Sequence, residues 1–566
     1  MKLNTLIAAG SLLLAGVTNA APLLSKRHAG PIGDLSKNAQ DLFDASLEFQ
    51  DGFWDEEAGY LVTADADLVG RYDSRQTAWY SVGLVARNDK GDIERAERIF
   101  ANIYKGMYKD PTKIWYGIIQ QAPDEPTPQE GVYDPSPYGS YDSNWRDFVG
   151  SAFVILLADY KERLSETGVD LVEKILWLSA KGDQYRVGGV DGDNLYPCYS
   201  NPWLMRVILQ SYAGYYFNDA NMTTWSETWA KEAYDLYKMY DTFSEFNSPT
   251  YTGVAMWALG QWIKYAPASS PLPGYAKEMF ADLMVLTKSL YNANLKNFAG
   301  PWDRSYGFDM NLYFSITAAT VWGLVGREYA PMPKQISGMY HQADFGIAHL
   351  IALGIPQIED LVPEATLEAF KKYPGPTSLA VQAFSPPFDT YPRNISVWSN
   401  DLITIGAEQI SELKIGGPAT SNYAFNPAVI QWYVREGRSG YITLWAQESV
   451  ISATAGEGYL DITYPNVTTS PGYDIGFSFS VSPFDIFPND NLTTMTSLPG
   501  LKLEISGNVN TSSEIFEYNI DHDVHGFWSF NSTWLMPSDF EGVPHIHIDV
   551  TEYPTSKNVT YSLSDL

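Results

Sequence analysis

The sequence predicts a two-domain α+β chain, with an N-terminal helical toroid followed by an antiparallel β-sandwich domain. Segments with helical spacing of apolar residues recur from residue 34 to about residue 371. After residue 375 the apolar segments become short and alternating, and Gly, Pro, Asn and Ser separate them. With 566 residues, 45% of them hydrophobic, the chain is long enough for two cores. No long low-complexity linker separates the two parts, so we expect them to pack against each other.

Two kinds of helix are predicted in the first part. In the segment 93–107 the apolar residues follow one helical face, whereas 153–158 is apolar on nearly every side. A helix that is apolar all round is buried between two layers. Inner buried helices that alternate with outer amphipathic ones therefore predict a double-layered ring. The predicted helices span 40–53, 74–87, 92–108, 145–160, 170–181, 202–217, 226–240, 252–265, 276–291, 310–327 and 338–351.

The second part has the pattern of short strands. Alternating segments at 441–445, 459–464, 475–481, 501–505 and 545–550 are separated by turn residues. This spacing is typical of an antiparallel sandwich. We place the helical domain at residues 28–371 and the β-sandwich domain, which we expect to be glycosylated, at residues 372–566.

The first residues have the three-part pattern of a secretory signal. Lys2 precedes an apolar run that ends in small residues at Ala20, which predicts a signal peptide at 1–20. The pair Lys26 and Arg27 predicts a propeptide at 21–27, and a chance basic pair explains it equally well. No later stretch reaches about 18 uninterrupted apolar residues, so we expect no membrane anchor. The pattern predicts a secreted, extracellular protein.

Asn-x-Ser/Thr sequons support export and are sites of N-glycosylation in secreted proteins. Most lie beyond residue 390, which predicts a C-terminal surface that is free to carry glycan. The predicted glycosylation sites are Asn221, Asn394, Asn466, Asn491, Asn510, Asn531 and Asn558.

Composition excludes several classes of partner. A formal charge of −30 argues against nucleic acid and anionic membranes, since both need a cationic face. The single cysteine, Cys198, excludes an intramolecular disulfide. The sequence has no P-loop, Rossmann glycine pattern or Gly-x-Ser-x-Gly elbow, so no cofactor is expected. It leaves the oligomeric state open.

A histidine-rich region of the second part contains residue types that can bind a metal. His545 and His547 would share one strand face, and with residues 521–525 they could hold a metal ion. Ordinary surface histidines are the preferred interpretation, so no metal is expected.

The loop 300–310 combines acids, an arginine and aromatic rings. Proline and glycine break regular structure there, immediately before an apolar helical segment. Polar loops on a rigid scaffold often carry chemistry, and these residue types suit a sugar ring. In the alternative interpretation, Arg304 pairs with an acid of the loop and only caps the next helix. The loop offers Trp302, Asp303, Arg304, Tyr306 and Asp309.

Two further loops precede buried helices. In 141–147, either Asp142 or Asn144 is expected to cap the helix, which leaves the other, with Arg146, to face a substrate. In 245–251, Pro249 suits the first helical turn, so Ser248 is expected to be the cap and Glu245 to be free. That loop also offers Asn247 and Tyr251.

The stretches 75–88, 114–117, 141–150 and 247–251 resemble the (α/α)6-toroid carbohydrate-active proteins. This class includes glycoside hydrolases and polysaccharide lyases with a C-terminal β-domain. The similarity covers most of residues 40–330 in architecture. It implies that loops entering the inner helices bind carbohydrate at one end of the ring.

Two reactions on a polysaccharide or oligosaccharide fit these loops. Hydrolysis needs one carboxyl group as acid and another as base or nucleophile. A lyase needs a cation or amide to neutralise a uronate, and a Tyr or His to move the C5 proton. We expect a hydrolase first and a lyase second. The catalytic candidates are Glu245, Asp142, Asp303 and Tyr306; the substrate-binding candidates are Asn144, Arg146, Asn247, Tyr251, Trp302, Arg304 and Asp309.

Two alternatives remain open. The loop 193–201 resembles the cysteine-containing loop of linalool dehydratase-isomerases, in which case Cys198 would act on a small terpenoid-like alcohol. A buried structural thiol is the preferred interpretation of Cys198. The other alternative is a glycan-binding protein without catalytic activity.

Overall fold

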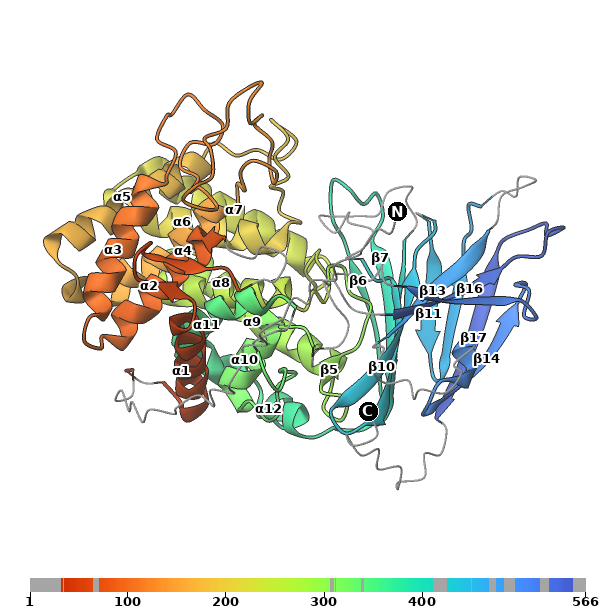
Figure 1. Cartoon of the computed structure of the whole chain (residues 1–566). Coiled ribbons are helices and arrows are strands. Elements are labelled where there is room, and N and C mark those ends of the chain that lie inside the picture. The colour runs from red at the N-terminus through yellow and green to blue at the C-terminus, as the bar shows by residue number, and fades with distance from the viewer. Residues whose placement is uncertain are drawn as a thin grey trace, which may run out of the picture.

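A computed structural model describes residues 32–33, 35–64, 71–305, 310, 312–336, 340–410, 425–448, 450–467, 475–482, 494–519 and 529–552. Over these ranges the chain forms a helical domain and then an antiparallel β domain, which lie side by side (Figure 1). The predicted fold class is therefore confirmed. Within the described ranges, no helix combines the length and apolar character needed to cross a membrane.

The helices of the described chain form an inner and an outer layer. The inner helices are α2 (Ser74–Arg87), α4 (Trp145–Asp159), α6 (Ser200–Phe217), α8 (Tyr251–Tyr265), α10 (Ile316–Val325) and α11 (Ala348–Ile358). The outer helices are α1 (Lys37–Asp51), α3 (Asp92–Lys105), α5 (Glu166–Asp183), α7 (Ala220–Lys238), α9 (Leu272–Leu290) and α12 (Glu364–Lys371). Short 3-10 turns at Lys161–Arg163, Gln342–Ile347 and Glu359–Leu361 join them.

The inner helices close into a ring. Each of α2, α4, α6, α8 and α10 packs against the next, and α11 packs against α8, α10 and α2. Each inner helix also packs against an outer one, in the pairs α2–α3, α4–α5, α6–α7, α8–α9, α10–α12 and α11–α1. Residues 253–262 of α8 are buried on every side, whereas α3 buries only one face around Phe100. The two kinds of helix seen in the sequence thus correspond to the two layers.

Caps explain several helix boundaries. Side chains of Ser36, Asp73, Ser165 and Asp219 accept hydrogen bonds from the first turns of α1, α2, α5 and α7. Ser315 caps α10 in the same way, so this helix begins later than the predicted segment 310–327. The predicted segment 338–351 is in part a 3-10 turn before α11, and α12 was not predicted.

Over its described residues, the β domain forms two antiparallel sheets (Figure 1). The larger has the order β15-β16-β13-β10-β9-β8-β7-β6 and the smaller β11-β12-β17-β14. The larger sheet is formed by β6 (Thr377–Ala383), β7 (Arg393–Ser399), β8 (Ile403–Gln409), β9 (Ala428–Arg435), β10 (Arg438–Trp445), β13 (Gly476–Ser482), β15 (Glu514–Asn519) and β16 (Ser529–Leu535). The smaller is formed by β11 (Ser452–Gly456), β12 (Tyr459–Thr463), β14 (Leu501–Gly507) and β17 (His545–Glu552).

The five predicted strands correspond to β10, β12, β13, β14 and β17. Two of the strands that were not predicted, β8 and β9, show no alternation because both of their faces are covered. Strand β8 is buried from Ile403 to Glu408, since one face lies in the sandwich core and the other meets the helical domain. Short two- and three-residue strands, β1 (Trp54–Asp55), β2 (Tyr60–Val62), β3 (Tyr72–Asp73), β4 (Tyr291–Asn292) and β5 (Asn297–Phe298), belong to the helical part.

A buried ion cluster joins the two domains. Arg393 of β7 lies 3.0 Å from Asp303, 2.9 Å from Glu408 and 3.5 Å from Asp389, and all four side chains are buried. Close backbone packing adds to this contact, because a Cβ atom at Gly406 would lie 1.7 Å from the carbonyl oxygen of Gly300. The loop 299–305 is therefore held by both domains.

Candidate functional site

The N-terminal ends of the inner helices converge at one end of the ring. The residues that meet there lie in the first turns of α2, α4, α6, α8, α10 and α11 or in the loops that lead into these helices. We call this group the ring-end cluster and define it as Arg75, Asp142, Tyr199, Glu245, Tyr251, Arg304, His341 and Asp344. Helix N-termini carry a partial positive charge and free N–H groups, so this end of the ring favours anions.

Arg304 lies at the centre of the ring-end cluster. Its Nη1 is 3.3 Å from the hydroxyl of Tyr199 and 3.6 Å from Oε1 of Glu245. Its guanidinium carbon lies 4.2 Å from the centre of the Tyr251 ring, within the range of a cation–π contact. The side chain keeps 20% of its surface exposed, so it can meet a ligand from solvent.

Glu245 is held beneath Arg304. It is only 3% exposed, and its Oε2 accepts a hydrogen bond of 3.1 Å from Nδ2 of Asn201. Burial raises the pKa of the Glu245 carboxyl, while the charge of Arg304 and the bond from Asn201 oppose that rise. Burial likewise raises the pKa of Tyr199, again against the charge of Arg304.

A second cation and a histidine lie on the other side of the cluster. Arg75 is 3.9 Å from Asp344, and Nδ1 of His341 is 3.1 Å from the same carboxylate. Burial acts to raise the pKa of Asp344, but His341 and Arg75 hold it below its usual value. An acid bound to one ring nitrogen fixes the orientation of a histidine, so the other nitrogen can exchange protons.

Asp142 is a half-buried carboxylate of the cluster. Its Oδ1 accepts a 2.8 Å hydrogen bond from the backbone N–H of Asn144, at the start of α4. Burial raises its pKa, and the charges of Arg75, Arg186 and Arg304 act in the opposite direction. Asp142 therefore lies within the field of cations on both sides of the cluster.

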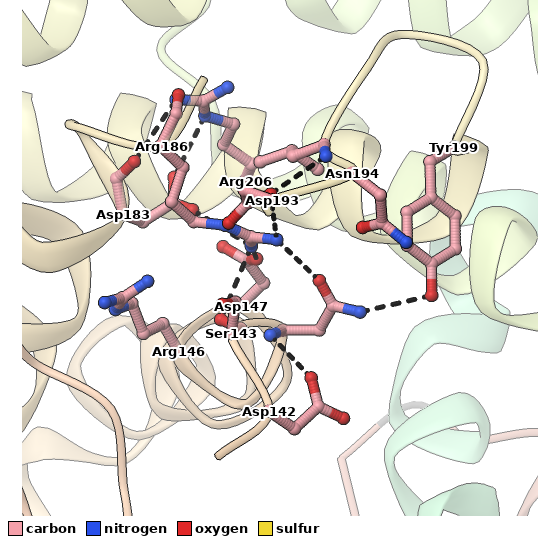
Figure 2. A network of polar contacts seen from close by, with 12 residues as sticks. Asp142, Ser143, Arg146, Asp147, Asp183, Arg186, Asp193, Asn194, Tyr199 and Arg206 are labelled. Atoms are coloured by element: carbon pink, nitrogen blue, oxygen red, sulfur yellow. Dashed lines mark hydrogen bonds and ion pairs between the residues drawn. The ribbon is translucent and has the colours of Figure 1, made fainter. Parts of the chain in front are cut away.

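A buried charge network supports one side of the cluster (Figure 2). Arg186 lies 2.8 Å from both Asp147 and Asp193 and donates to Oδ1 of Asn144 at 2.9 Å. Asp183 contacts Arg186 at 3.4 Å and Arg206 at 3.0 Å. Every charge in a buried network of this kind needs a partner, so the network fixes the positions of these side chains.

The structure brings five of the predicted site residues to the ring end: Glu245, Asp142, Asn144, Tyr251 and Arg304. The side chain of Asn144 does not cap α4. At the start of α8, Ser248 accepts a 3.2 Å hydrogen bond from the N–H of Tyr251, which agrees with its predicted role as a cap. Tyr306 and Asp309 lie outside the described residues.

Four other candidates lie elsewhere. Arg146 is buried, and its guanidinium donates to the carbonyls of Tyr116 and Ile114. Asn247 donates to the carbonyls of Ala299 and Pro301 and so braces the loop 299–305. Trp302 has an exposed fraction of 0% and lies between the domains, and Asp303 is paired with Arg393. The structure does not bring these side chains together with Arg304.

Several residues at this end of the ring were not among the predicted site residues: Arg75, Tyr199, Asn201, His341 and Asp344. Their position in the sequence could have indicated them, because each stands at or shortly before the start of an inner helix. His349 of α11 lies in the core, where burial lowers its pKa to about 4. Burial also raises the pKa of the Cys198 thiol, in keeping with a structural role for that residue.

Two grooves lie outside the cluster. One of about 600 Å³ is lined by aromatic residues of α6, α7 and the preceding loop, including Tyr185, Tyr196, Trp203, Trp225 and Trp229. Another of about 810 Å³ runs between the domains and is lined by Lys296, Arg327, Glu328, Lys334, Arg435, Glu436 and Arg438 among others. Rings and cations of these kinds can contact sugars and their acidic groups.

The sequons differ in accessibility. Asn221, Asn394, Asn466 and Asn510 are exposed, and Asn531 is half-buried. Asn491 and Asn558, like the predicted signal peptide and propeptide, lie outside the described residues.

The fold and the cluster define a two-domain protein in which a helical toroid, with polar residues gathered at one end, is joined to a β-sandwich domain. The chain belongs to the family described as "Domain of unknown function (DUF8769)", whose model matches residues 40–356. A second model, "Domain of unknown function (DUF8770)", matches residues 375–551. No curated protein matches the sequence.

Solved structures with a similar chain path include glycosaminoglycan lyases. A heparinase III structure has a TM-score of 0.49 and 9% identity, over 94% of this chain and 87% of that one. A mutant of the heparan sulfate lyase HepC from Pedobacter heparinus has a TM-score of 0.42 and 10% identity, over 93% and 85%. The Streptomyces coelicolor A3 chondroitin AC lyase, in complex with chondroitin sulphate, has a TM-score of 0.41 and 9% identity, over 94% and 80%.

Proposed function

We propose that the protein is a secreted polysaccharide lyase that cleaves a uronate-containing glycan by β-elimination at the ring-end cluster. The observation that carries the proposal is the position of Arg304, which contacts the hydroxyl of Tyr199, the ring of Tyr251 and the carboxylate of Glu245. A partly exposed cation beside two tyrosines supplies both charge neutralisation and proton transfer, the two requirements of this reaction.

The charge distribution supports an acidic substrate. Arg75 and Arg304 bring two guanidinium groups to the ends of the inner helices, whose N-termini add partial positive charge. A guanidinium can bind a uronate carboxylate with two parallel hydrogen bonds. Binding of this kind neutralises the carboxylate and makes the neighbouring C5 proton more acidic. The overall charge of −30 offers no general attraction for an anion, so binding of an acidic glycan would depend on these two guanidinium groups.

Proton transfer can be assigned to two side chains of the ring-end cluster. In our proposal His341, oriented by Asp344, takes the C5 proton, and the C5–H electrons form the C4–C5 double bond as the C4–O bond breaks. The hydroxyl of Tyr251 donates a proton to the departing oxygen. Asn201 donates to Glu245 and so holds that carboxylate beside Arg304. The products are one fragment with a new reducing end and one whose non-reducing end is an unsaturated uronate.

Hydrolysis, the first expectation from the sequence, is the second candidate. The raised pKa of Glu245 favours it, because a protonated carboxyl can act as general acid. Two of the three candidate carboxylates for hydrolysis are already paired, however. Glu245 contacts Arg304 and Asn201, and Asp303 contacts Arg393. Two-carboxylate hydrolysis needs both groups beside the scissile bond, which this arrangement supports less well than elimination.

Activity on a panel of polysaccharides tests the proposal. Wild-type protein is incubated with uronate-containing and neutral glycans, and new reducing ends and ultraviolet absorbance of unsaturated products are followed together. We expect both signals, from uronate-containing glycans alone. Reducing ends without absorbance would replace the lyase with the hydrolase, and neither signal on any glycan would leave the binding protein or the dehydratase.

Matched variants connect the activity to the ring-end cluster. Arg304→Lys keeps the charge but loses the planar fork, so we expect a strong rise in KM for the acidic glycan. Arg98→Lys makes the same exchange on the outer helix α3, where Arg98 pairs with Glu56, and serves as the control. Equal activity of the two variants would contradict the assignment of Arg304.

We also propose that the protein is exported and glycosylated. N-terminal sequencing of the protein secreted by a eukaryotic host should begin after Ala20 or after Arg27. Mass spectrometry of its peptides should find glycan on the exposed sequons, beginning with Asn221 and Asn394. A protein retained in the cell with an intact N-terminus would contradict this proposal.

A further inference from the structure

A second cluster of polar side chains lies on the outer face of the smaller sheet, away from the ring end. Strand β17 runs between β12 and β14, and its residues Ile546, Ile548 and Val550 face the sandwich core. Because side chains alternate along a strand, His545 and His547 share the opposite face, as the sequence predicted. Residues 521–525, which the sequence analysis grouped with them, lie outside the described ranges.

The register of the sheet adds a carboxylate to these two histidines. Strand β12 pairs with β17 so that Asp461 stands opposite His547. Its Oδ1 lies 2.7 Å from Nε2 of His545 and 2.9 Å from Nδ1 of His547. The three potential ligand atoms all lie within 4.8 Å of one another.

Two imidazole nitrogens and one carboxylate oxygen form a suitable ligand set for zinc. Zn²⁺ binds His nitrogen and Asp oxygen at about 2.0–2.2 Å in a tetrahedron, and water can complete the four positions. Small rotations of the side chains suffice to open the present hydrogen-bonded arrangement around an ion. Ca²⁺ and Mg²⁺ prefer oxygen ligands only, so a site with two imidazoles disfavours them.

Neighbouring side chains hold one of the ligands in orientation. Nε2 of His547 lies 3.4 Å from Oδ1 of Asp549, on the side of the ring away from Asp461. The ring of Tyr459 stacks on that of His547, with centroids 5.6 Å apart and an angle of 21° between the planes. Metal-bound histidines commonly donate their second N–H to a carboxylate, which fixes the ring and raises its basicity. Asp549 can fill that role here.

We propose that Asp461, His545 and His547 form a Zn²⁺ site on the outer face of the β-sandwich. The ligands are Oδ1 of Asp461, Nε2 of His545 and Nδ1 of His547, with Asp549 as the orienting partner of His547. All three ligands stand on hydrogen-bonded strands, which hold a constellation more firmly than loops do. The bound ion would cross-link β12 to β17 and so stabilise the smaller sheet. The site is independent of the proposed lyase activity.

The exposure of the three side chains suits an ion that enters from solvent. Asp461, His545 and His547 keep 36%, 35% and 28% of their side-chain surface exposed. The same cluster without an ion would be a hydrogen-bonded triad of ordinary surface residues. A zinc site requires all three side chains for stoichiometric metal binding, whereas a hydrogen-bonded surface triad binds no metal stoichiometrically.

Zinc titration of the full-length, tag-free protein tests the site. The protein is first treated with a chelator and then titrated with Zn²⁺ by calorimetry, with the bound metal counted by atomic absorption. We expect one ion per chain in the wild type. His545→Ala, His547→Ala and Asp461→Asn should each lower the affinity at least tenfold, and Asp549→Asn should lower it less.

Glu504→Gln provides the matched control. Glu504 is an exposed acid of the same sheet face, it lies opposite Asp549 in the register, and it pairs with Lys502. Its loss removes surface charge without removing a proposed ligand, so Zn²⁺ should bind this variant as it binds the wild type. Zinc should also raise the unfolding temperature of the wild type and the control, but not that of His545→Ala.

Two outcomes would overturn the proposal. One is the absence of any stoichiometric zinc binding by the wild type. The other is unchanged binding after His545→Ala and Asp461→Asn, which would place the metal at other residues. Circular dichroism of each variant checks that the fold is retained, and His545→Gln gives a second, less disruptive removal of the same ligand.

Discussion

The side-chain amide of Asn144 lies 3.2 Å from the hydroxyl of Tyr199, while its oxygen accepts a hydrogen bond from Arg186. A single residue thus connects the buried charge network of Figure 2 to the ring-end cluster. Tyr199 in turn contacts Arg304. The position of the proposed substrate-binding arginine therefore depends on charges that no substrate can reach.

The network should be costly to break. We expect Arg186→Met to lower the free energy of unfolding by about 3–5 kcal/mol, because it leaves Asp147, Asp183 and Asp193 without their shared cation. Chemical denaturation measures this loss. Lys174→Met, which removes an exposed pair with Asp170, should change stability by less than about 1 kcal/mol. Similar losses in both variants would contradict the structural role of the network.

Tyr251→Phe should impair the chemical step without unfolding the protein. Removal of a general acid commonly costs about 10²–10⁴-fold in rate, and we expect a fall of that order in kcat on an acidic glycan. The ring remains to stack on Arg304, so KM and the unfolding temperature should change little. Tyr234→Phe removes a hydroxyl that bonds Glu278 between outer helices and is the control. A kcat equal to that of this control would exclude Tyr251 as the acid.

His349 should make the helical domain sensitive to acid. Its folded pKa is lowered from 6.5 to about 4 by burial, so the neutral ring is favoured in the folded state. Its contribution to stability is therefore present above pH 6.5 and is lost as pH falls towards 4, by about 3 kcal/mol in all. Equilibrium unfolding at several pH values measures the slope. His349→Gln should flatten the curve over this window, and an unchanged slope would assign the acid sensitivity to other groups.

Glu408 should produce the opposite trend at the domain interface. Burial and the nearby Asp303 raise its folded pKa well above 4.5, so the folded state favours the protonated form. Its contribution is fully present below pH 4.5 and declines as pH rises through the folded pKa. Glu408→Gln has the shape of the protonated side chain but cannot ionise. The stability of this variant relative to the wild type should therefore increase with pH. Parallel stability curves for the two proteins would show that Glu408 is ionised in the interface.

The sequence predicted the helices well because the inner and outer positions leave different patterns. Residues 74–87 were predicted as a helix and form α2 with the same limits. Strands were harder to predict, since β8 and β9 are covered on both faces and show no alternation. The loop residues were the least predictable. Nothing in the sequence around Trp302 and Asp303 indicates that a second domain covers them, whereas the neighbouring Arg304 remains partly exposed.

Arg75 and His341 illustrate a different limit. They are separated by more than 260 positions, and their proximity arises only because α11 closes the ring next to α2. A search restricted to acid-rich loops could not join them. The common feature of the cluster is its position before the inner helices, and a search organised by that feature would have included both residues.

The loop 299–305 has a consequence for how such chains can diverge. Two of its residues depend on the β domain: Asp303 pairs with Arg393, and Gly300 packs against Gly406, where no side chain would fit. Arg304 of the same loop belongs to the ring-end cluster. A lineage that loses or exchanges its second domain would also have to substitute these residues of the loop 299–305. Among natural chains that carry the first domain, the identities at positions equivalent to 300, 303, 393 and 406 should therefore change together, as a record of shared ancestry of the two halves.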